Sequence, residues 1–174
     1  RVGLGRVEVP GGQAVFPSLP VAETLLAGAH RFGWDRVEIG SRIDEVVALL
    51  PRLSERFDQR AGSLSGGEQQ MLAIGKALLL RPRLLLIDEL SLGLAPVVVQ
   101  DLLVVVERLK AQGVTMVLVE QSLNVSLSVA DRALFMEKGQ IRFEGAASDL
   151  LVRDDILRSV IRTNASAARP PADS

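Results

Sequence analysis

Apolar residues recur at every third or fourth position in several stretches of the chain, a period that predicts amphipathic helices. The first stretch follows Pro20, a residue that suits the first turn of a helix, and the second ends before Pro51. Further helices are expected over residues 64–80 and from Pro96 to a cap at Gly113. The apolar positions that set the period are Val21, Leu25 and Ala29; Ile39, Ile43, Val46 and Leu50; and Val98, Leu102, Val105 and Leu109.

Short apolar runs between the later helices predict strands. Leu84–Ile87 contains four aliphatic residues, as in a central parallel strand, and Val114–Val119 is a second run. Ala133–Met136 and Ile141–Phe143 predict a hairpin that turns at Lys138–Gly139. Strand and helix alternate after residue 83, which predicts an α/β fold with a mainly parallel sheet. The minor elements expected are a short strand within residues 1–20, a short helix at 122–130 and one or two helices ending near residue 162.

Composition narrows the class of protein. The 174 residues are 48% hydrophobic and 24% charged, as in an ordinary globular protein, and the longest apolar runs fall short of the roughly 18 residues of a membrane helix. The net charge of −1 and the absence of a block of basic residues in the sequence give no indication that the protein binds nucleic acid. The absence of cysteine excludes disulfides and thiolate metal sites, and no secretory signal is visible, which favours the cytoplasm. The chain begins with Arg1 rather than Met, so we expect its natural start to be missing.

Two glycines open the helix expected over residues 64–80. Gly66 and Gly67 allow the backbone to approach an anion closely, because the first N–H groups of a helix lack intrahelical partners and lie at the positive end of its dipole. Ser65 adds a hydroxyl donor. Taken alone, such a turn more often only enters a helix, and a phosphate site is the alternative.

An acidic pair follows the first apolar strand. Asp88 at the end of a buried parallel strand is well placed to hold Mg²⁺, directly or through water. Glu89 can polarise a water molecule for attack on phosphorus. A lone acidic pair at a strand end is commonly only solvated. The combination with the glycine-rich helix start favours phosphate chemistry.

These motifs resemble those of ATP-binding cassette (ABC) ATPases. Leu64–Gln70 resembles the signature motif, Leu84–Glu89 the Walker B strand, and Ser91–Pro96 the D-loop and the residues after it. The sequence of residues 64–96 is similar to that of the ATPase subunits of high-affinity branched-chain amino-acid importers, and so are the segments Phe16–Leu19 and Val119–Gln121. The resemblance covers about residues 7–145. It implies a partial P-loop NTPase (ABC ATPase) fold, with helices on both faces of the sheet and an all-helical signature subdomain.

The resemblance also implies a domain plan and a role for each matching residue. Residues 1–15 would end the core with the Q-loop region, 16–66 would form the helical subdomain, 67–162 the RecA-like core and 163–174 a disordered tail. ATP bound by a partner subunit would be contacted by the signature residues Ser65, Gly66, Gly67, Glu68 and Gln69. Asp88 would bind Mg²⁺, Glu89 would be the general base, and Gln121, at the switch-histidine position, would hydrogen-bond the γ-phosphate. The D-loop residues Ser91, Leu92 and Gly93 would couple the two nucleotide sites.

The implied function is ATP hydrolysis that energises an importer of branched-chain amino acids. ATP and Mg²⁺ would be the cofactors. The implied partners are a second ATPase subunit, identical or different, membrane permease subunits and, indirectly, a periplasmic substrate-binding protein; no nucleic acid is expected. The protein would then sit peripherally on the cytoplasmic face of the inner membrane.

Three departures from the family pattern keep alternatives open. No G-x-x-x-x-G-K-[ST] motif occurs, and the one Gly-Lys pair, Gly75–Lys76, is expected inside a helix. Gly11 occupies the Q-loop position, with neither Glu8 nor Gln13 in register, and Leu90 replaces the proline that usually follows the acidic pair. The simplest interpretation is a cassette that lacks its N-terminal P-loop region. The alternatives are a catalytically incomplete cassette that donates its signature in trans, and an ABC ATPase outside transport.

One further pattern involves arginines. Arg52, Arg56 and Arg60 recur at a spacing of four ahead of the signature. Contact with a partner is possible for such a row, but a solvated face is the more common outcome.

Overall fold

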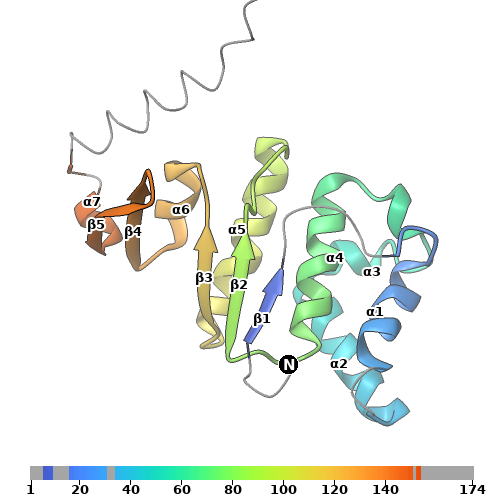
Figure 1. Ribbon diagram of the computed structural model, residues 1–174. Coiled ribbons are helices and arrows are strands. Elements are labelled where there is room, and N and C mark those ends of the chain that lie inside the picture. Colours follow the sequence, from blue (N-terminus) through green and yellow to red (C-terminus); the bar gives the residue numbers. More distant parts are fainter. Residues whose placement is uncertain (1–5, 10–15, 31–33, 151, 154–174) are drawn as a thin grey trace, which may run out of the picture. The chain divides into compact units, whose positions relative to one another are not determined.

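The computed structural model describes residues 6–9, 16–30, 34–150 and 152–153 (Figure 1). The chain divides into two units. The first unit ends at Val125 and the second begins at Ser126. Within the described ranges, no helix is both long enough and apolar enough to cross a bilayer.

The first unit contains a parallel sheet of three strands, as the sequence predicts. Its strands are β1 (Arg6–Val9), β2 (Leu84–Asp88) and β3 (Thr115–Val119), in the order β1-β2-β3. Both pairings are parallel, so β2 is the central strand and its aliphatic run is flanked on both sides.

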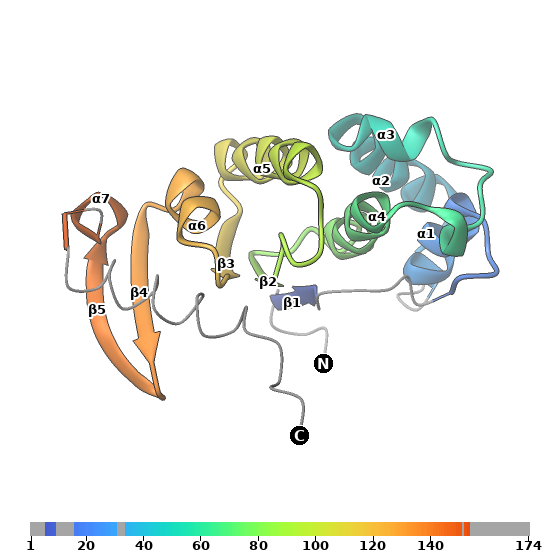
Figure 2. The same cartoon turned by 90° about the horizontal axis from the view of Figure 1, so that it is seen from above.

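The two faces of this sheet differ in their cover. Leu85 and Ile87 are almost completely buried, and in Figure 2 the helices α4 (Gly66–Leu78) and α5 (Pro96–Ala111) lie on one side of the strands. On the other face Val117 is 46% exposed and Val119 is 56% exposed. The family resemblance implies helices on both faces, and among the described residues helices cover one face.

Helix α5 connects β2 to β3 and confirms the expected start at Pro96. Three of the four predicted face positions, Leu102, Val105 and Leu109, are buried, and Val98 is half-buried. The cap residue is Gln112 rather than Gly113. Gly113 follows it with φ of 79°, the left-handed conformation that a glycine after a helix end adopts without steric cost.

The helical segment between β1 and β2 also follows the predicted pattern. It comprises α1 (Val21–His30), α2 (Arg36–Leu49), α4 and two short elements, α3 (Pro51–Ser54) and a 3₁₀ turn (Ala61–Ser63). The sequence analysis missed α3. Proline ends the preceding helix because it has no N–H to donate, but it is also favourable at the first position of a new one.

Two arginines join α2 to the end of α4. The Arg42 guanidinium donates from Nη1 to the Leu79 carbonyl at 2.8 Å and from Nη2 to Glu38 at 2.7 Å, and it lies 4.0 Å from the centroid of the Trp34 ring. Arg81, directly beyond α4, forms an ion pair with Glu45. The bond from Arg42 satisfies the carbonyl of Leu79, the C-cap residue of α4, and both contacts hold the end of α4 against α2.

A set of backbone hydrogen bonds ties the entry of α1 to the chain ahead of α4. We call this set the backbone clasp: it joins residues 17–22 to residues 57–62. Its bonds run from Val21 N–H to the Gln59 carbonyl at 2.9 Å, from Ala22 to Phe57 at 3.0 Å, from Ala61 to Leu19 at 2.9 Å and from Gly62 to Pro17 at 2.9 Å.

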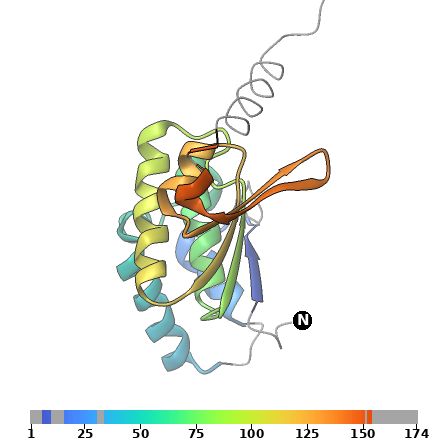
Figure 3. The same cartoon turned by 90° about the vertical axis from the view of Figure 1, so that its left-hand side faces the viewer.

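The second unit confirms the predicted hairpin, whose orange strands can be followed in Figure 3. Strands β4 (Arg132–Glu137) and β5 (Gln140–Ala146) are antiparallel, and Lys138 and Gly139 turn between them with φ of 49° and 76°. A short α7 (Ala147–Leu150) follows, and α6 (Leu123–Val129) spans the boundary between the units. The helices expected near residue 162, the expected tail and the Q-loop position Gly11 lie outside the described residues.

Candidate nucleotide site

The acidic pair leaves the sheet at the carboxyl edge of β2. Asp88 is the last residue of the strand and lies in register with Val119, the last residue of β3. The Glu89 N–H continues the pairing by donating to the Val119 carbonyl at 2.9 Å. Ligands of open α/β sheets bind outside this edge, so the pair stands where a phosphate ligand is expected.

Backbone and side chain together fix the position of Glu89. Its φ of 51° lies in the left-handed region, which a residue with a Cβ adopts at a steric cost and most often at functional sites. Its carboxylate Oε1 accepts a hydrogen bond from the Gln121 amide Nε2 at 2.9 Å. The structure thus brings together two predicted site residues that lie far apart in the sequence. Asp88 and Gln121 are both exposed at this edge.

The loop after the acidic pair is anchored on one side and open on the other. Leu90, in the position of the usual proline, is completely buried. Leu92 is 64% exposed, and Gly93 has φ of 71°. The predicted D-loop residues therefore project from a loop that a buried leucine holds against the core.

Glu120 is a member of this site that the sequence analysis missed. Its Oε1 accepts the Ser91 backbone N–H at 2.7 Å, and its Oε2 accepts the Ser91 hydroxyl at 2.9 Å. Both residues are half-buried. The sequence offered two signals, an acidic residue directly after a predicted strand and its place in the family-like segment Val119–Gln121, and neither identifies a partner.

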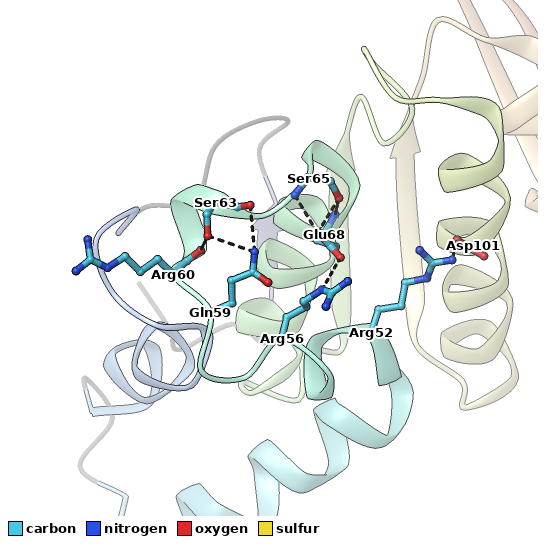
Figure 4. Close-up of polar contacts among 8 residues, drawn as sticks. All are labelled: Arg52, Arg56, Gln59, Arg60, Ser63, Ser65, Glu68 and Asp101. Carbon is cyan, nitrogen blue, oxygen red and sulfur yellow. Dashed lines mark hydrogen bonds and ion pairs between the residues drawn. The ribbon is translucent and has the colours of Figure 1, made fainter.

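The signature motif forms the start of α4 (Figure 4). Ser65 is the N-cap residue: its hydroxyl accepts the Glu68 N–H at 3.3 Å, and the Glu68 carboxylate accepts the Ser65 N–H at 2.9 Å. This reciprocal arrangement is a capping box. The first intrahelical bond runs from the Gln69 N–H to the Ser65 carbonyl, so the N–H groups of Gly66 and Gly67 precede the helical ladder.

The two signature glycines also have a packing role. A Cβ atom on Gly67 would overlap the side chain of Val98 in the first turn of α5, and a Cβ on Gly66 would lie 3.1 Å from Leu94. Gly67 is buried. The sequence analysis assigned these glycines to anion approach alone; the structure adds the close contact of the α4 start with the start of α5.

Charge near the signature is balanced by the arginines ahead of it. Burial raises the pKa of Glu68, but hydrogen bonds from Ser65 and the neighbouring Arg56 outweigh it and leave that pKa below its ordinary value. Arg56 Nε lies 3.3 Å from Glu68 Oε1, and Arg52 lies 2.7 Å from Asp101 on α5. The expected solvated face is therefore correct only in part, because two of its three arginines form ion pairs while staying half-exposed.

The remaining glycine–lysine pair is not a phosphate loop. Gly75 and Lys76 lie inside α4, as predicted. A Cβ on Gly75 would lie 3.1 to 3.3 Å from side chains of Val46, Leu50 and Leu53, so this glycine allows the close packing of α4 on α2 and α3.

Known proteins are similar to this chain in sequence and in fold. The sequence pattern of the ABC transporter family matches residues 6–91. The high-affinity branched-chain amino acid transport ATP-binding protein BraG of Pseudomonas aeruginosa is 47% identical over 148 residues, which cover 85% of this chain and 63% of the relative. The probable branched-chain amino acid transport ATP-binding protein LivF of Archaeoglobus fulgidus is 34% identical over 155 residues, which cover 87% and 64%.

Among solved structures, the ADP conformation of an ATP-binding cassette of an ABC transporter superposes with a TM-score of 0.76 at 27% identity, over 90% of this chain and 68% of that one. The chain therefore belongs to the ABC transporter ATP-binding family, and its fold is part of an ATP-binding cassette. It spans 63% of the length of the Pseudomonas relative and 64% of that of the Archaeoglobus relative.

Proposed function

We propose that the full-length gene product hydrolyses ATP and powers an importer of branched-chain amino acids. The observation that carries the proposal is the Glu89 carboxylate at the carboxyl edge of β2, held by a left-handed backbone and by the Gln121 amide. A carboxylate fixed in this way can accept the proton of a water molecule that attacks the γ-phosphoryl group in line.

Asp88 is proposed to hold Mg²⁺ with the nucleotide. Its exposed carboxylate stands next to Glu89 at the strand end. Mg²⁺ commonly takes one or two carboxylates and completes its shell with water and phosphate oxygens. A single exposed carboxylate at the strand end fits a cation whose other ligands come from phosphate and water. The ion would neutralise charge on the phosphates.

The signature residues are proposed to act on the nucleotide of a second cassette. Gly66 and Gly67 present backbone N–H groups at the start of α4, and Ser65 adds a hydroxyl that in this structure donates to the Glu68 carboxylate at 2.9 Å. Glu68 and Gln69 stabilise this helix start. Ser91–Gly93 would face the partner and couple the two sites. The second cassette is either a copy of this protein or a different ATPase subunit. Permease subunits, a periplasmic substrate-binding protein that contacts them and a place at the cytoplasmic membrane face complete the proposal.

The cargo assignment rests on relatedness alone. The Pseudomonas and Archaeoglobus relatives are named for transport of branched-chain amino acids. Deletion of the gene should abolish high-affinity uptake of leucine, isoleucine and valine. Unchanged uptake, or co-purification with ribosomes or DNA instead of a permease, would favour a non-transport ABC ATPase.

The test of the catalytic assignment is Glu89→Gln in the full-length product. We expect ATP binding to persist and turnover to fall by a factor of 10² or more, because the amide does not accept the proton. Glu107→Gln, on the exposed side of α5, is the matched control and should hydrolyse ATP like the wild type. A wild-type protein that binds no ATP without a second cassette would favour the alternative of a signature donated in trans.

A further inference from the structure

Two consecutive residues after β3 each hold a different part of the chain that follows β2. Gln121 holds the Glu89 side chain at 2.9 Å, and Glu120 holds Ser91 through both carboxylate oxygens. The Val119 carbonyl, one residue earlier, accepts the Glu89 N–H. The end of β3 is thus hydrogen-bonded to the acidic pair and to the loop after it at three successive positions.

The contact between Glu120 and Ser91 determines where the loop begins. A carboxylate that accepts a backbone N–H and a hydroxyl from the same residue fixes both its position and its orientation, and hydrogen bonds to ionised acceptors are stronger than neutral ones. The distances of 2.7 and 2.9 Å and the half-burial of both residues indicate a formed contact shielded from competing water. Leu92 and Gly93, which follow directly, are exposed.

We propose that Glu120 is a positioning residue that links the Gln121 side of the nucleotide site to the exposed loop at Ser91–Gly93. The inference rests on the proposed function, in which Gln121 holds the Glu89 carboxylate and the loop meets the second cassette. A shift of the β3 end on nucleotide binding then moves Ser91 with it, because Glu120 and Gln121 are neighbours on one backbone. A change at one nucleotide site is thereby transmitted to the loop that faces the second cassette.

The alternative is that Glu120 only stabilises the turn, and the two roles differ in what they change. A stabilising residue alters the melting temperature but not the chemistry of the folded protein. A positioning residue alters kcat while the affinity for ATP stays the same, and its effect disappears when Ser91 cannot respond. Ser91→Ala removes the hydroxyl and leaves the N–H, so it breaks one of the two bonds.

The experiment measures kcat, the dissociation constant for ATP and the melting temperature of full-length Glu120→Ala, Glu120→Gln, Ser91→Ala and the Ser91→Ala/Glu120→Ala double variant. We expect Glu120→Ala to lower kcat at least tenfold with ATP affinity within twofold of wild type. Glu120→Gln, which keeps one acceptor oxygen, should fall between, and the double variant should be no slower than Glu120→Ala. Ile43→Val in the core of the helical segment is the control for loss of stability and should keep the wild-type kcat.

The outcomes separate the two proposals. Two results would overturn this inference and leave the proposed function standing. One is a wild-type kcat in Glu120→Ala, and the other is an equal loss of kcat in the Ile43→Val control at the same melting temperature. A wild-type protein without ATP hydrolysis would overturn both. Amide exchange provides a readout that does not need turnover: the Ser91 N–H should exchange at least tenfold faster in Glu120→Ala, and unchanged exchange would refute the contact itself.

Discussion

Replacement of the second signature glycine by alanine tests the packing of α4 on α5. In a helix, alanine is ordinarily more favourable than glycine because it loses less backbone entropy on folding. At Gly67 the added Cβ would overlap Val98 Cγ1, and Val98 is β-branched, with little freedom to change its χ1 angle in a helix. Gly40 in α2 is the matched control, because a Cβ there meets nothing within 4 Å.

The expected magnitudes have opposite signs. Overpacking costs about 1–3 kcal/mol, which exceeds the propensity gain, so Gly67→Ala should lower the free energy of unfolding by about 1–2 kcal/mol. Gly40→Ala should raise it by about 0.5–1 kcal/mol. In a cassette of ordinary size the two variants should then differ in melting temperature by roughly 4–12 °C. Thermal unfolding of the full-length variants without nucleotide measures this difference.

A second substitution identifies the cause. Val98→Ala removes the Cγ1 atom that blocks the new Cβ and leaves the Val98 Cβ, which lies at 3.3 Å from it. Gly67→Ala/Val98→Ala should therefore melt at a higher temperature than Gly67→Ala, although it has lost two methyl groups. The reasoning is refuted if Gly67→Ala is as stable as Gly40→Ala, or if the double variant is no more stable than Gly67→Ala.

Three further predictions concern charge. The pKa of Glu68 is lower in the folded protein than in the unfolded chain, so on acidification the unfolded chain binds the proton first. The stability that Glu68 contributes is therefore present above the unfolded pKa and is lost as pH falls through the folded pKa. The unfolding midpoint of Glu68→Gln should depend less on pH below about 5 than that of wild type, and equal slopes would contradict this. Arg42→Lys should cost about 1–2 kcal/mol in chemical denaturation, because an ammonium does not reproduce the fork to Leu79 and Glu38, whereas the exposed Arg36→Lys should be neutral. Gln121→His should make the ratio of variant to wild-type kcat change with pH around 6.5, and a constant ratio between about pH 5.5 and 8 would argue against contact of residue 121 with Glu89.

Period and run length predicted the elements of this chain well, because burial dictates them. The helices α1, α2 and α5 were predicted from apolar spacing, α4 from its glycine-rich start and the stop at Arg81–Pro82, and the strands β2 and β3 and the hairpin from short apolar runs bounded by turn residues. The sequence analysis missed the short helix α3 because four residues are too few to show the apolar period of a helix. Its start at Pro51 gives the same local signal as the end of the helix before it.

The candidate site was predicted residue by residue but not as an arrangement. Motif spacing indicated Asp88, Glu89 and the signature. Only the parallel register of β2 and β3 shows that Gln121 meets Glu89 and that Glu120 meets Ser91. Such pairings depend on which strands are neighbours and how they align, and a list of residue types does not contain that information.

The position of the helical segment between β1 and β2 has a consequence for folding. Arg6 pairs with Leu84, so β1 finds its partner only after every helix of that segment has been synthesised. The backbone clasp closes within the segment itself, and β4 and β5 are neighbours in the chain, so both can form from shorter loops with less loss of chain entropy. Of the strands that the structure describes, β1 therefore waits longest for its partner β2, and their pairing closes a longer loop than that of any other described strand pair.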